Sequence, residues 1–494
     1  MLLLEAGGND DSPAVRIPAA FGTMMNTSVD WSYTTVPQVA IGKSINVPRG
    51  RMLGGSSSMN GMMYVRGNEA DFDGWRDNFG AEGWGYADVL PYFIRAEDNS
   101  RLAGPFHGTG GPQRIEDPVY LHEVSRAFVD TAVSQGLARN DDFNGKSQFG
   151  AGFHQVTCKD GERWSAADGY LRPAMSRPNL TVLTDSQAVR VQLTGARATG
   201  VVYRRGGTEH TVQAEAEVLL CGGVIGSPQL LMLSGIGPAA QLRELGIEPV
   251  VDLSGVGANL QEHPTVPMVW RTTGTTDVVE LAGMPEAMAE WQRSRRGPLT
   301  SNIGEAAAFL SLDPTDAAPS LQLYAGGTAF FDDGQGRAGV PCFGGVVSLV
   351  TPRSRGTVRL ASADPDDKPL IDFGFYQDRA DFDTVLGGLH LLHDMVNHDP
   401  LRSLLAAPYL PTCADPDDAE LTEHIKRWTQ SMYHPAGTCA MGTGDDAVLD
   451  PSLRVRGISG LRVVDASVMP TVTRGNTHAP TNMIAEKAAD LIKS

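Results

Sequence analysis

Two histidines near the carboxyl end of the chain lie in sequences that suit proton transfer. His434 lies in a Tyr-His-Pro turn, and His478 lies in Asn-Thr-His-Ala-Pro, just before a helical pattern. Imidazole has an unperturbed pKa of about 6.5, close to working pH, so it can accept or give a proton during a reaction. Any single histidine among the 11 is more often structural than catalytic, so the surrounding elements have to support the role.

A second block with chemical potential is the run from Gly50 to Gly61, Gly-Arg-Met-Leu-Gly-Gly-Ser-Ser-Ser-Met-Asn-Gly. Its adjacent glycines and three serines supply many N–H and hydroxyl donors in a small space. Such a loop can follow a phosphate or lie along a planar cofactor. A merely flexible loop would have the same composition, so the order of the flanking motifs decides between the two.

The elements around these blocks follow from hydrophobic spacing. Glu217–Cys221 is an apolar strand that runs into two glycines, and Ser227–Leu233 is typical of a helix start, with Pro228 near its first turn. Strand, glycine turn and helix together have the local shape of a nucleotide-binding α/β unit. Apolar periodicity also predicts helices at 86–96, 121–135 and the C-terminus, and strands at 180–183, 188–193, 200–203, 345–350, 356–360 and 461–465.

The composition is globular and excludes several classes of function. The 494 residues carry 40 Lys and Arg against 58 Asp and Glu, a net charge of −18, which argues against a nucleic-acid partner. The five cysteines are scattered without metal-ligand spacing, so we expect neither a disulfide framework nor a metal site. No run approaches the roughly 18 apolar residues of a membrane-spanning helix. The cysteines fit a reducing, cytoplasmic location.

Several long motifs, in register over essentially the whole chain, resemble those of the glucose–methanol–choline (GMC) flavin oxidoreductases. The run from Gly50 to Gly67 closely resembles the first signature of that family, and the run from Gly222 to Pro238 is similar to the second. The resemblance, which is to choline dehydrogenase-like and alcohol dehydrogenase-like members, continues at 84–98, 255–263, 351–359, 431–442, 461–470 and 475–490. Motifs of this length in the family's order are far more specific than a lone G-x-G-x-x-G.

The resemblance implies an α/β plus α+β fold. It consists of a discontinuous, Rossmann-like FAD-binding domain and a substrate-binding domain with an antiparallel sheet. We expect the FAD-binding domain to comprise residues 1–127, 169–279 and 432–494, and the substrate-binding domain to comprise 128–168 and 280–431. The sequence itself points to a second, α+β domain, because Pro and Asp turns separate apolar strands from about 265 to 430.

The resemblance also implies FAD as the cofactor and assigns residues to it by position. Glu5 would bind the adenosine ribose, and Val189 would contact the adenine end through its backbone. Asp465 and Ala466 would lie near the ribityl and phosphate chain, although an Asp in a turn after a strand is common. The loop residues that would pass along the pyrophosphate and the flavin are Arg51, Gly54, Gly55, Ser56, Ser57, Asn60 and Gly61.

For catalysis, the resemblance implies oxidation of a primary or secondary alcohol to the aldehyde or ketone, with hydride transfer to flavin N5. His434 would contact the substrate and be the main acid/base. His478 would hydrogen-bond the substrate oxygen beside the cofactor, and a shared acid/base role for it stays open, with Asn476 as the backup candidate. Many choline dehydrogenase-like members have Asn where this chain has His478, so the division of labour stays open. The N-terminus of the last helix, expected near Thr481, would stabilise the anionic reduced flavin.

Glu305 lies in Ser-Asn-Ile-Gly-Glu-Ala, where we expect the substrate cavity. A buried carboxylate in that place could attract a cationic substrate such as choline. It could equally be a structural ion-pair partner, which is the interpretation we favour.

The amino end is unusual for this family. Met1–Leu4 has the pattern of a buried strand, followed by Glu5 and a glycine turn, without the charged region or cleavage site of a signal peptide. Family members open with a strand–GxGxxG–helix unit of about 30 residues before this acidic residue. No such unit is present, so we expect that the reading frame begins further upstream and that a GTG codon for Val, at the first position of this strand, has been read as a start. The alternative is a short product that folds poorly or binds no FAD.

Two other functions are compatible with these motifs. One is an FAD-free or inactive truncated homologue kept for a binding role, and the other is a lyase on the GMC fold. For the oxidoreductase we expect a small-molecule alcohol as substrate and a quinone, another carrier or O2 as electron acceptor. We expect no nucleic-acid partner and no integral membrane segment, and a homodimer stays open. Choline, a longer aliphatic alcohol, an aromatic alcohol and a polyol all fit.

Overall fold

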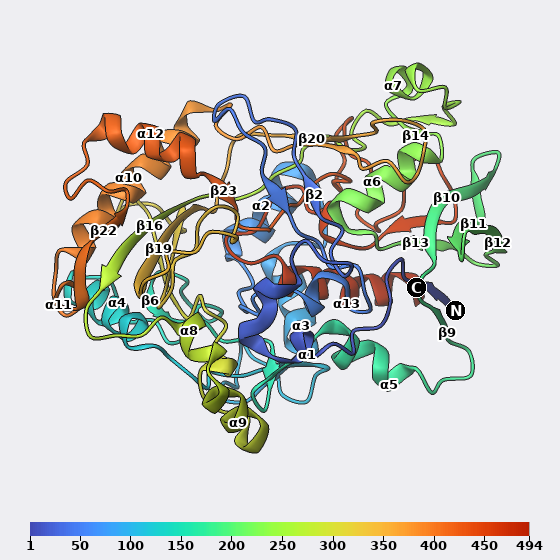
Figure 1. The fold of residues 1–494 in the computed structure, drawn as a ribbon. Coiled ribbons are helices and arrows are strands. Elements are labelled where there is room, and N and C mark those ends of the chain that lie inside the picture. Colours follow the sequence, from blue (N-terminus) through green and yellow to red (C-terminus); the bar gives the residue numbers. More distant parts are fainter. Residues whose placement is uncertain (494) are drawn as a thin grey trace.

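An antiparallel sheet occupies one half of the molecule (Figure 1). The computed structural model describes residues 1–493. Seven strands follow the order β22–β16–β19–β18–β17–β6, with β23 paired to the start of β16, and every pairing is antiparallel. The strands are β6 (Gly150–Phe153), β16 (Pro264–Thr272), β17 (Ala306–Leu310), β18 (Leu321–Gly326), β19 (Cys342–Leu349), β22 (Leu405–Leu410) and β23 (Gln430–Ser431).

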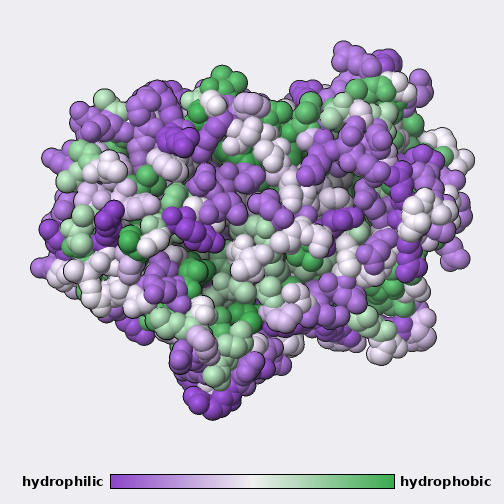
Figure 2. All heavy atoms as spheres, viewed as in Figure 1, coloured by the Kyte–Doolittle hydropathy of each residue, from purple (hydrophilic) through white to green (hydrophobic). Residues whose placement is uncertain are grey.

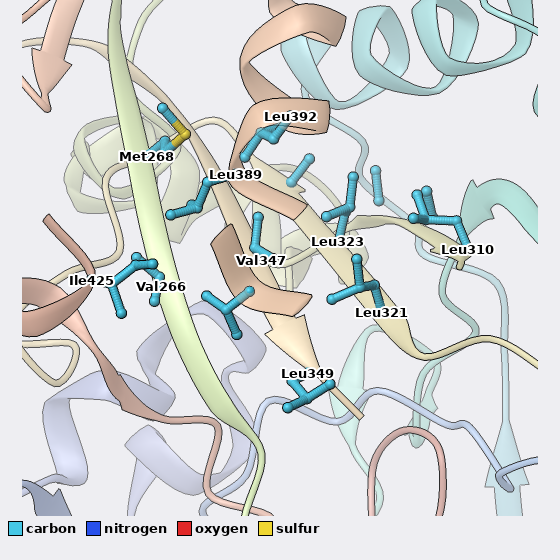
Figure 3. Close-up of a cluster of buried hydrophobic side chains, with 14 of the residues drawn as sticks. Val266, Met268, Leu310, Leu321, Leu323, Val347, Leu349, Leu389, Leu392 and Ile425 are labelled. Carbon is cyan, nitrogen blue, oxygen red and sulfur yellow. The ribbon is translucent and has the colours of Figure 1, made fainter. Parts of the chain in front are cut away.

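The two faces of this sheet differ because successive side chains on a strand alternate. On β18, Leu321 and Leu323 belong to the main hydrophobic core, whereas Gln322 and Tyr324 lie on the opposite face. Figure 3 shows Leu389 and other leucines of the overlying helix packed against the core-facing side chains of the strands. The polar face is therefore free to contribute to a site between the two halves of the molecule.

Three helices cover the hydrophobic face: α4 (Glu123–Ser134), α10 (Arg379–Val396) and α12 (Asp418–Trp428). Each begins where a side chain accepts a hydrogen bond from a free N–H of the first turn. The capping residues are His122, Asp378 and Asp417. Full burial of one leucine is worth about 1.5–3 kcal/mol, so contacts along α10 alone stabilise the sheet strongly.

The other half contains two short parallel ladders rather than one continuous sheet. β1 (Leu2–Leu4) pairs with β9 (Thr181–Leu183), and β13 (Val218–Leu220) pairs with β24 (Leu461–Val463). Within residues 1–493, β1 and β13 each have one strand neighbour only. Their other edges are open, so Leu219 is 37% exposed and Leu2–Leu4 are half-buried rather than buried as we expected.

Two helices begin earlier than their sequences indicated. α6 (Gly223–Leu233) starts four residues before Ser227, because the Asp465 carboxylate accepts a hydrogen bond from the Gly223 N–H at 2.9 Å. Pro228 therefore lies inside the helix. α13 (His478–Lys493) starts at His478 rather than near Thr481, since Pro480 is tolerated in a first turn. α13 crosses the middle of the molecule and packs along α3 (Tyr86–Ala96) (Figure 1).

The remaining predicted elements lie close to their expected positions. A three-stranded antiparallel sheet, β10–β11–β12, projects at one end, and α8 and α9 project at another (Figure 1). These and the other helices and strands are α1 (Pro13–Arg16), α2 (Glu69–Phe79), α5 (Arg172–Ala174), α7 (Ala239–Glu244), α8 (Val278–Gly283), α9 (Pro285–Ser294), α11 (Leu401–Leu404), β2 (Tyr33–Thr34), β3 (Asn46–Val47), β4 (Glu97–Asn99), β5 (Gln113–Ile115), β7 (Cys158–Lys159), β8 (Glu162–Arg163), β10 (Gln187–Thr194), β11 (Arg197–Arg205), β12 (Thr208–Gln213), β14 (Ile236–Gly237), β15 (Val251–Asp252), β20 (Thr357–Arg359) and β21 (Leu370–Asp372).

The antiparallel sheet extends across one of the predicted domain boundaries. β16 falls within 169–279, the range expected for the FAD-binding domain, yet it pairs with β19 and β22. Its apolar run is buried on both faces over most of its length, so it belongs to the sheet core. The face seen in Figure 2 is largely hydrophilic, with hydrophobic side chains gathered near its middle. None of the helices described over 1–493 is long and apolar enough to cross a membrane.

Candidate active site

His434 lies in the turn that follows β23, and Glu262 holds this turn against the start of β16. The turn depends on Tyr433, whose φ of 66° reverses the chain. One carboxylate oxygen of Glu262, Oε1, accepts hydrogen bonds from the backbone N–H of His263 at 2.7 Å and of His434 at 3.0 Å. Burial raises the pKa of Glu262 to about 7. One side chain thus fixes the backbones of two histidines.

Both ring nitrogens of His434 are engaged, and the side chain is buried. Nδ1 lies 3.1 Å from Nδ1 of His263, and Nε2 lies 2.9 Å from Nδ2 of Asn476. Burial, and then the neighbouring His263 and Arg49, lower the pKa of His434 well below its ordinary value. The ring is therefore neutral at neutral pH, which is the form that accepts a proton.

Asn476 is held by a loop that is anchored at several points. Arg474 in this loop pairs with Asp71 of α2, and its N–H donates to the same carboxylate at 2.8 Å. Gln148 donates from Nε2 to the Arg474 carbonyl at 2.6 Å. At Gly475 a Cβ would lie 2.7 Å from a methyl group of Val65, so only glycine lets the loop pass. The amide of Asn476 is consequently delivered to His434 on a rigid support.

His478 is the first residue of α13 and has fewer partners. Its Nε2 lies 3.4 Å from Nδ2 of Asn482, and its Nδ1 has no partner among residues 1–493. Burial, together with the nearby Arg163, lowers the pKa of His478 to about 4, so this ring is also neutral. The structure thus brings Asn476, the backup candidate, into contact with His434, and shows no hydrogen bond from His434 to His478.

Glu305 is fully buried and bonded at both oxygens. Oε1 accepts from the Ser301 hydroxyl at 2.6 Å, and Oε2 accepts from the His122 N–H, at the start of α4, also at 2.6 Å. Burial raises the pKa of Glu305 despite these donors. Among the described residues it forms no ion pair, so its contacts are those of a helix-start anchor rather than of an ion-pair partner.

Glu5, Arg51 and Val189 lie at the ends of the short strands. Glu5 follows β1, and its Oε1 accepts from the Gly7 N–H at 2.8 Å. Burial raises the pKa of Glu5, while the Arg51 charge opposes the rise. Val189 sits at a break in the register between β10 and β11, where its backbone leaves the ladder. Glu5 thus lies at the carboxyl end of a parallel strand, and Val189 lies at an irregularity of the β10–β11 ladder.

The loop from Gly54 to Gly61 is braced by its own polar side chains. Ser57 donates from Oγ to the Gly54 carbonyl at 2.6 Å, and Asn60 Oδ1 accepts from Arg163 at 2.8 Å. Ser56 accepts from a backbone N–H at 3.2 Å. The hydroxyl groups that we expected to face a cofactor therefore shape the loop. The backbone at Gly55 is what remains open, because a Cβ there would meet nothing within 4 Å.

Asp465 and Ala466 close the β13–β24 ladder. Asp465 caps the turn that begins at Ala466 and accepts from the Ser227 hydroxyl at 2.6 Å in addition to its bond to the start of α6. Burial raises the pKa of Asp465. The carboxylate thus links the glycine turn after β13 to the turn after β24.

Sequence reasoning gave no role to Glu262, His263 and Tyr324, which lie around His434. The motif that contains Glu262 and His263 was part of the resemblance, but nothing in its spacing connects it to a histidine 171 residues away. Tyr324 lies in β18, a strand of mostly apolar residues, and only the pairing of the strands reveals which face its side chain occupies.

Comparison with known proteins identifies the family to which this chain belongs. The GMC oxidoreductase N-terminal model matches residues 22–265, and the GMC oxidoreductase C-terminal model matches residues 352–485. An uncharacterized GMC-type oxidoreductase of Mycobacterium bovis is 41% identical, over 100% of this chain and 94% of its own. An oxygen-dependent choline dehydrogenase of Brucella anthropi is 39% identical over 100% and 90%. An alcohol dehydrogenase [acceptor] of Pseudomonas putida is 37% identical over 99% and 90%.

Solved structures agree with this identification. Pyridoxine 4-oxidase from Mesorbium loti matches with a TM-score of 0.90 and 31% identity, over 99% of this chain and 93% of that one. Formate oxidase of Aspergillus oryzae, a protein with FAD, matches with a TM-score of 0.92 and 28% identity, over 100% and 93%. The GMC fold expected from the sequence is therefore confirmed.

The described residues fit FAD. Gly55 and Gly223 face space that a Cβ would not fill, and Cys221 is exposed at the carboxyl end of β13. Arg51 Nε and His478 Nδ1 are buried polar atoms without a partner among residues 1–493. Buried donors and acceptors are normally paired in folded proteins, so unpaired ones beside open glycine turns suit a polar ligand.

Proposed function

Because this chain belongs to the GMC oxidoreductase family and has FAD as its cofactor, we propose that it oxidises a primary or secondary alcohol with His434 as the base. The observation that carries the proposal is the state of His434. Its ring is buried, neutral and aimed through Nε2 at a polar neighbour rather than at a carboxylate. A neutral imidazole can take the hydroxyl proton as the carbon gives up its hydride.

Bound FAD supplies the hydride acceptor. In our proposal Asn476 orients the imidazole of His434 through its Nδ2. The substrate hydroxyl takes the place of this N–H at Nε2, because a neutral imidazole nitrogen has one lone pair. His478, with its unpaired Nδ1, lies against the cofactor at the start of α13. The partial positive charge of that helix end favours a neighbouring anion.

We place the adenosine end of FAD at Glu5 and Val189. Support comes from the position of Glu5 at the carboxyl end of a parallel strand and from the unpaired backbone at Val189. The phosphates would pass Gly55 and Arg51, and the region of Asp465 would carry the chain between phosphates and flavin. Gly55 has open space beside its backbone, and Arg51 has an unpaired Nε among the described residues. Asp465 binds the N–H of Gly223, which also has open space beside it.

The alcohol and the electron acceptor are to be identified by experiment. Relatives act, by name, with oxygen or with an acceptor, so the protein should be supplied with choline, aliphatic, aromatic and polyol alcohols, each with a dye acceptor and with O2. Anaerobic bleaching of the flavin by an alcohol supports the oxidation. Conversion of a cyanohydrin without bleaching would point instead to a lyase.

Replacement of the base tests its role directly. His434→Ala should lower kcat by a factor of about 10²–10⁴, the usual contribution of general-base catalysis. His210→Ala is the matched control, since His210 is exposed on β12, far from this loop in the chain. Near-wild-type turnover of His434→Ala, with flavin retained, would refute the assignment.

A further inference from the structure

The contact between the two buried histidines poses a question of proton placement. Nδ1 of His434 faces Nδ1 of His263 at 3.1 Å, so one of the two nitrogens must carry the hydrogen and the other must accept it. Burial lowers the pKa of His263 to about 3, and His434 is also neutral. Each ring therefore has one N–H, and the choice at one ring determines the other.

A chain of hydrogen bonds that starts at His154 indicates which ring nitrogen of His434 carries the hydrogen. His154 contacts the Gly304 carbonyl through Nδ1 at 3.0 Å; a carbonyl only accepts, so Nδ1 carries the hydrogen. Burial lowers the pKa of His154 to about 4, which leaves its Nε2 without a hydrogen. Gln322 must then present its Nε2 amide to that nitrogen, at 3.1 Å.

The same chain continues along the polar face of β18 to the active site. Since Gln322 gives its NH2 to His154, its Oε1 is left to accept the Tyr324 hydroxyl at 2.8 Å. Burial raises the pKa of Tyr324, and the neighbouring Asn476 opposes the rise. Nδ2 of Asn476 lies 3.7 Å from the sulfur of Met63, whereas its Oδ1 has no partner among the described residues. Asn476 therefore points its NH2 group at His434, 2.9 Å away, and Nε2 of His434 must accept.

The surroundings of His263 are compatible with the same choice. Burial lowers the pKa of His263, while the backbone groups of Val350 and Thr473 near the ring oppose this. Its Nε2 has no hydrogen-bond partner among the described residues, so no donor occupies that nitrogen. The hydrogen of His263 can therefore lie on Nε2, and Nδ1 of His263 can accept from His434.

We propose that His263 is a positioning residue that holds His434 as its Nδ1–H tautomer, with Nε2 as the acceptor. The inference rests on the proposed function, in which His434 takes the substrate proton. The orientation of Asn476 requires this tautomer, and the hydrogen-bond chain along β18 ends at the Gly304 carbonyl, which cannot reverse its polarity. Glu262 keeps the pair in register by binding both backbones. The reacting nitrogen thus stays unprotonated before substrate arrives.

The tautomer can be measured in the holoenzyme by ¹⁵N NMR after labelling the histidines. The signals of His434 are identified by their loss in His434→Ala. In the wild type we expect Nδ1 of His434 to be protonated and Nε2 to be unprotonated. A wild-type spectrum with the hydrogen on Nε2 of His434 would overturn the proposal, whatever the variants do.

Two substitutions at His263 add a functional readout. His263→Leu removes the acceptor, so the tautomer of His434 should shift and kcat should fall by about 10-fold or more with little change in KM, because a misplaced tautomer costs the base its lone pair. His263→Gln should restore much of the rate, since its amide oxygen can accept from Nδ1 of His434. Equal losses in both variants, with flavin content unchanged, would contradict the positioning role.

The outcomes separate this proposal from the one it rests on. If His434→Ala keeps its turnover, the proposed base is wrong even where the spectrum shows the expected tautomer. If His434→Ala is inactive but His263→Leu retains both the Nδ1–H signal of His434 and full turnover, His434 is supported as the base and the positioning role of His263 is contradicted. Should His263→Leu fail to fold, the wild-type spectrum alone still decides.

Discussion

Nε2 of His434 lies 2.9 Å from the side-chain nitrogen of Asn476, although 42 residues separate them in the chain. One belongs to the turn after β23 and the other to the loop before α13, and each loop has its own anchor. The pair that meets in the site is thus a histidine and an asparagine. His478, two residues further on, turns into the first turn of the helix instead.

This contact predicts unequal effects at Asn476 and His478. Asn476→Ala removes the hydrogen bond to Nε2 of His434 and leaves its ring held through Nδ1 alone, so kcat should fall about 10- to 100-fold, the loss of an oriented group being comparable with that of an acid/base partner. His478→Ala should affect kcat less and alter the flavin spectrum more. Stopped-flow reduction by a good alcohol substrate measures both. A larger loss of kcat in His478→Ala than in Asn476→Ala would reverse the assignment.

The depressed pKa of His434 predicts an unusual pH profile. Its ring stays neutral as pH falls through the ordinary histidine value of about 6.5, so kcat/KM should show no inflection there. Glu262, with a pKa of about 7, is the neighbouring group that could produce one. The pH profiles of kcat/KM for the wild type and for Glu262→Gln show whether His434 or Glu262 causes an inflection. An inflection near 6.5 that persists in Glu262→Gln would mean that His434 titrates normally.

Glu305 is expected to support structure rather than bind a cation. Glu305→Gln can keep its oxygen on the His122 N–H, but its NH2 then faces the Ser301 hydroxyl and reverses that hydrogen bond, so stability should fall by about 0.5–1.5 kcal/mol, the usual contribution of one hydrogen bond. Thermal unfolding measures the loss, with Glu280→Gln on exposed α8 as control. The ratio of KM values for choline and a neutral alcohol should not change. A selective rise in KM for choline would restore the cation-binding role.

Gly7 is a sensitive position for cofactor content. A Cβ at Gly7 would lie 1.9 Å from the Arg51 carbonyl oxygen, so Gly7→Ala must displace the loop that carries Arg51. The flavin-to-protein absorbance ratio of the purified variant should fall several-fold, because overpacking against backbone typically costs about 1–3 kcal/mol. Gly22→Ala, where a Cβ meets no atom within 4 Å, should leave the ratio unchanged. Equal ratios in the two variants would show that this turn does not shape the cofactor site.

The parts of the fold that were foreseeable are those governed by local periodicity. α3 begins and ends where its apolar spacing indicated, and β19 and β24 lie within or across their predicted runs. The start of α13 was predicted too late, because Pro480 looked like a boundary whereas it occupies the third position of the helix. Local sequence cannot show which residue supplies a remote cap, as Asp465 does for α6.

The candidate site divides in the same way. His434 and Asn476 were foreseeable because they lie in motifs whose order resembles a known family. The roles of His263 and Tyr324 were not, since both depend on contacts across strands distant in sequence. Tyr324 faces the site only because β18 pairs with β17 and β19 in one particular register.

That register makes turnover a stricter reporter of folding than colour. A slip of one residue in β18 would carry Gln322 and Tyr324 to the leucine face and bring leucines toward the active site. The chain of hydrogen bonds that orients Asn476 would then be broken, while the turns at Gly55 and Gly223, in the other half of the molecule, would be unaffected. A molecule with this slip would keep the turns proposed to hold its yellow cofactor and yet fail to react with its alcohol, so activity reports the register of β18 and colour does not.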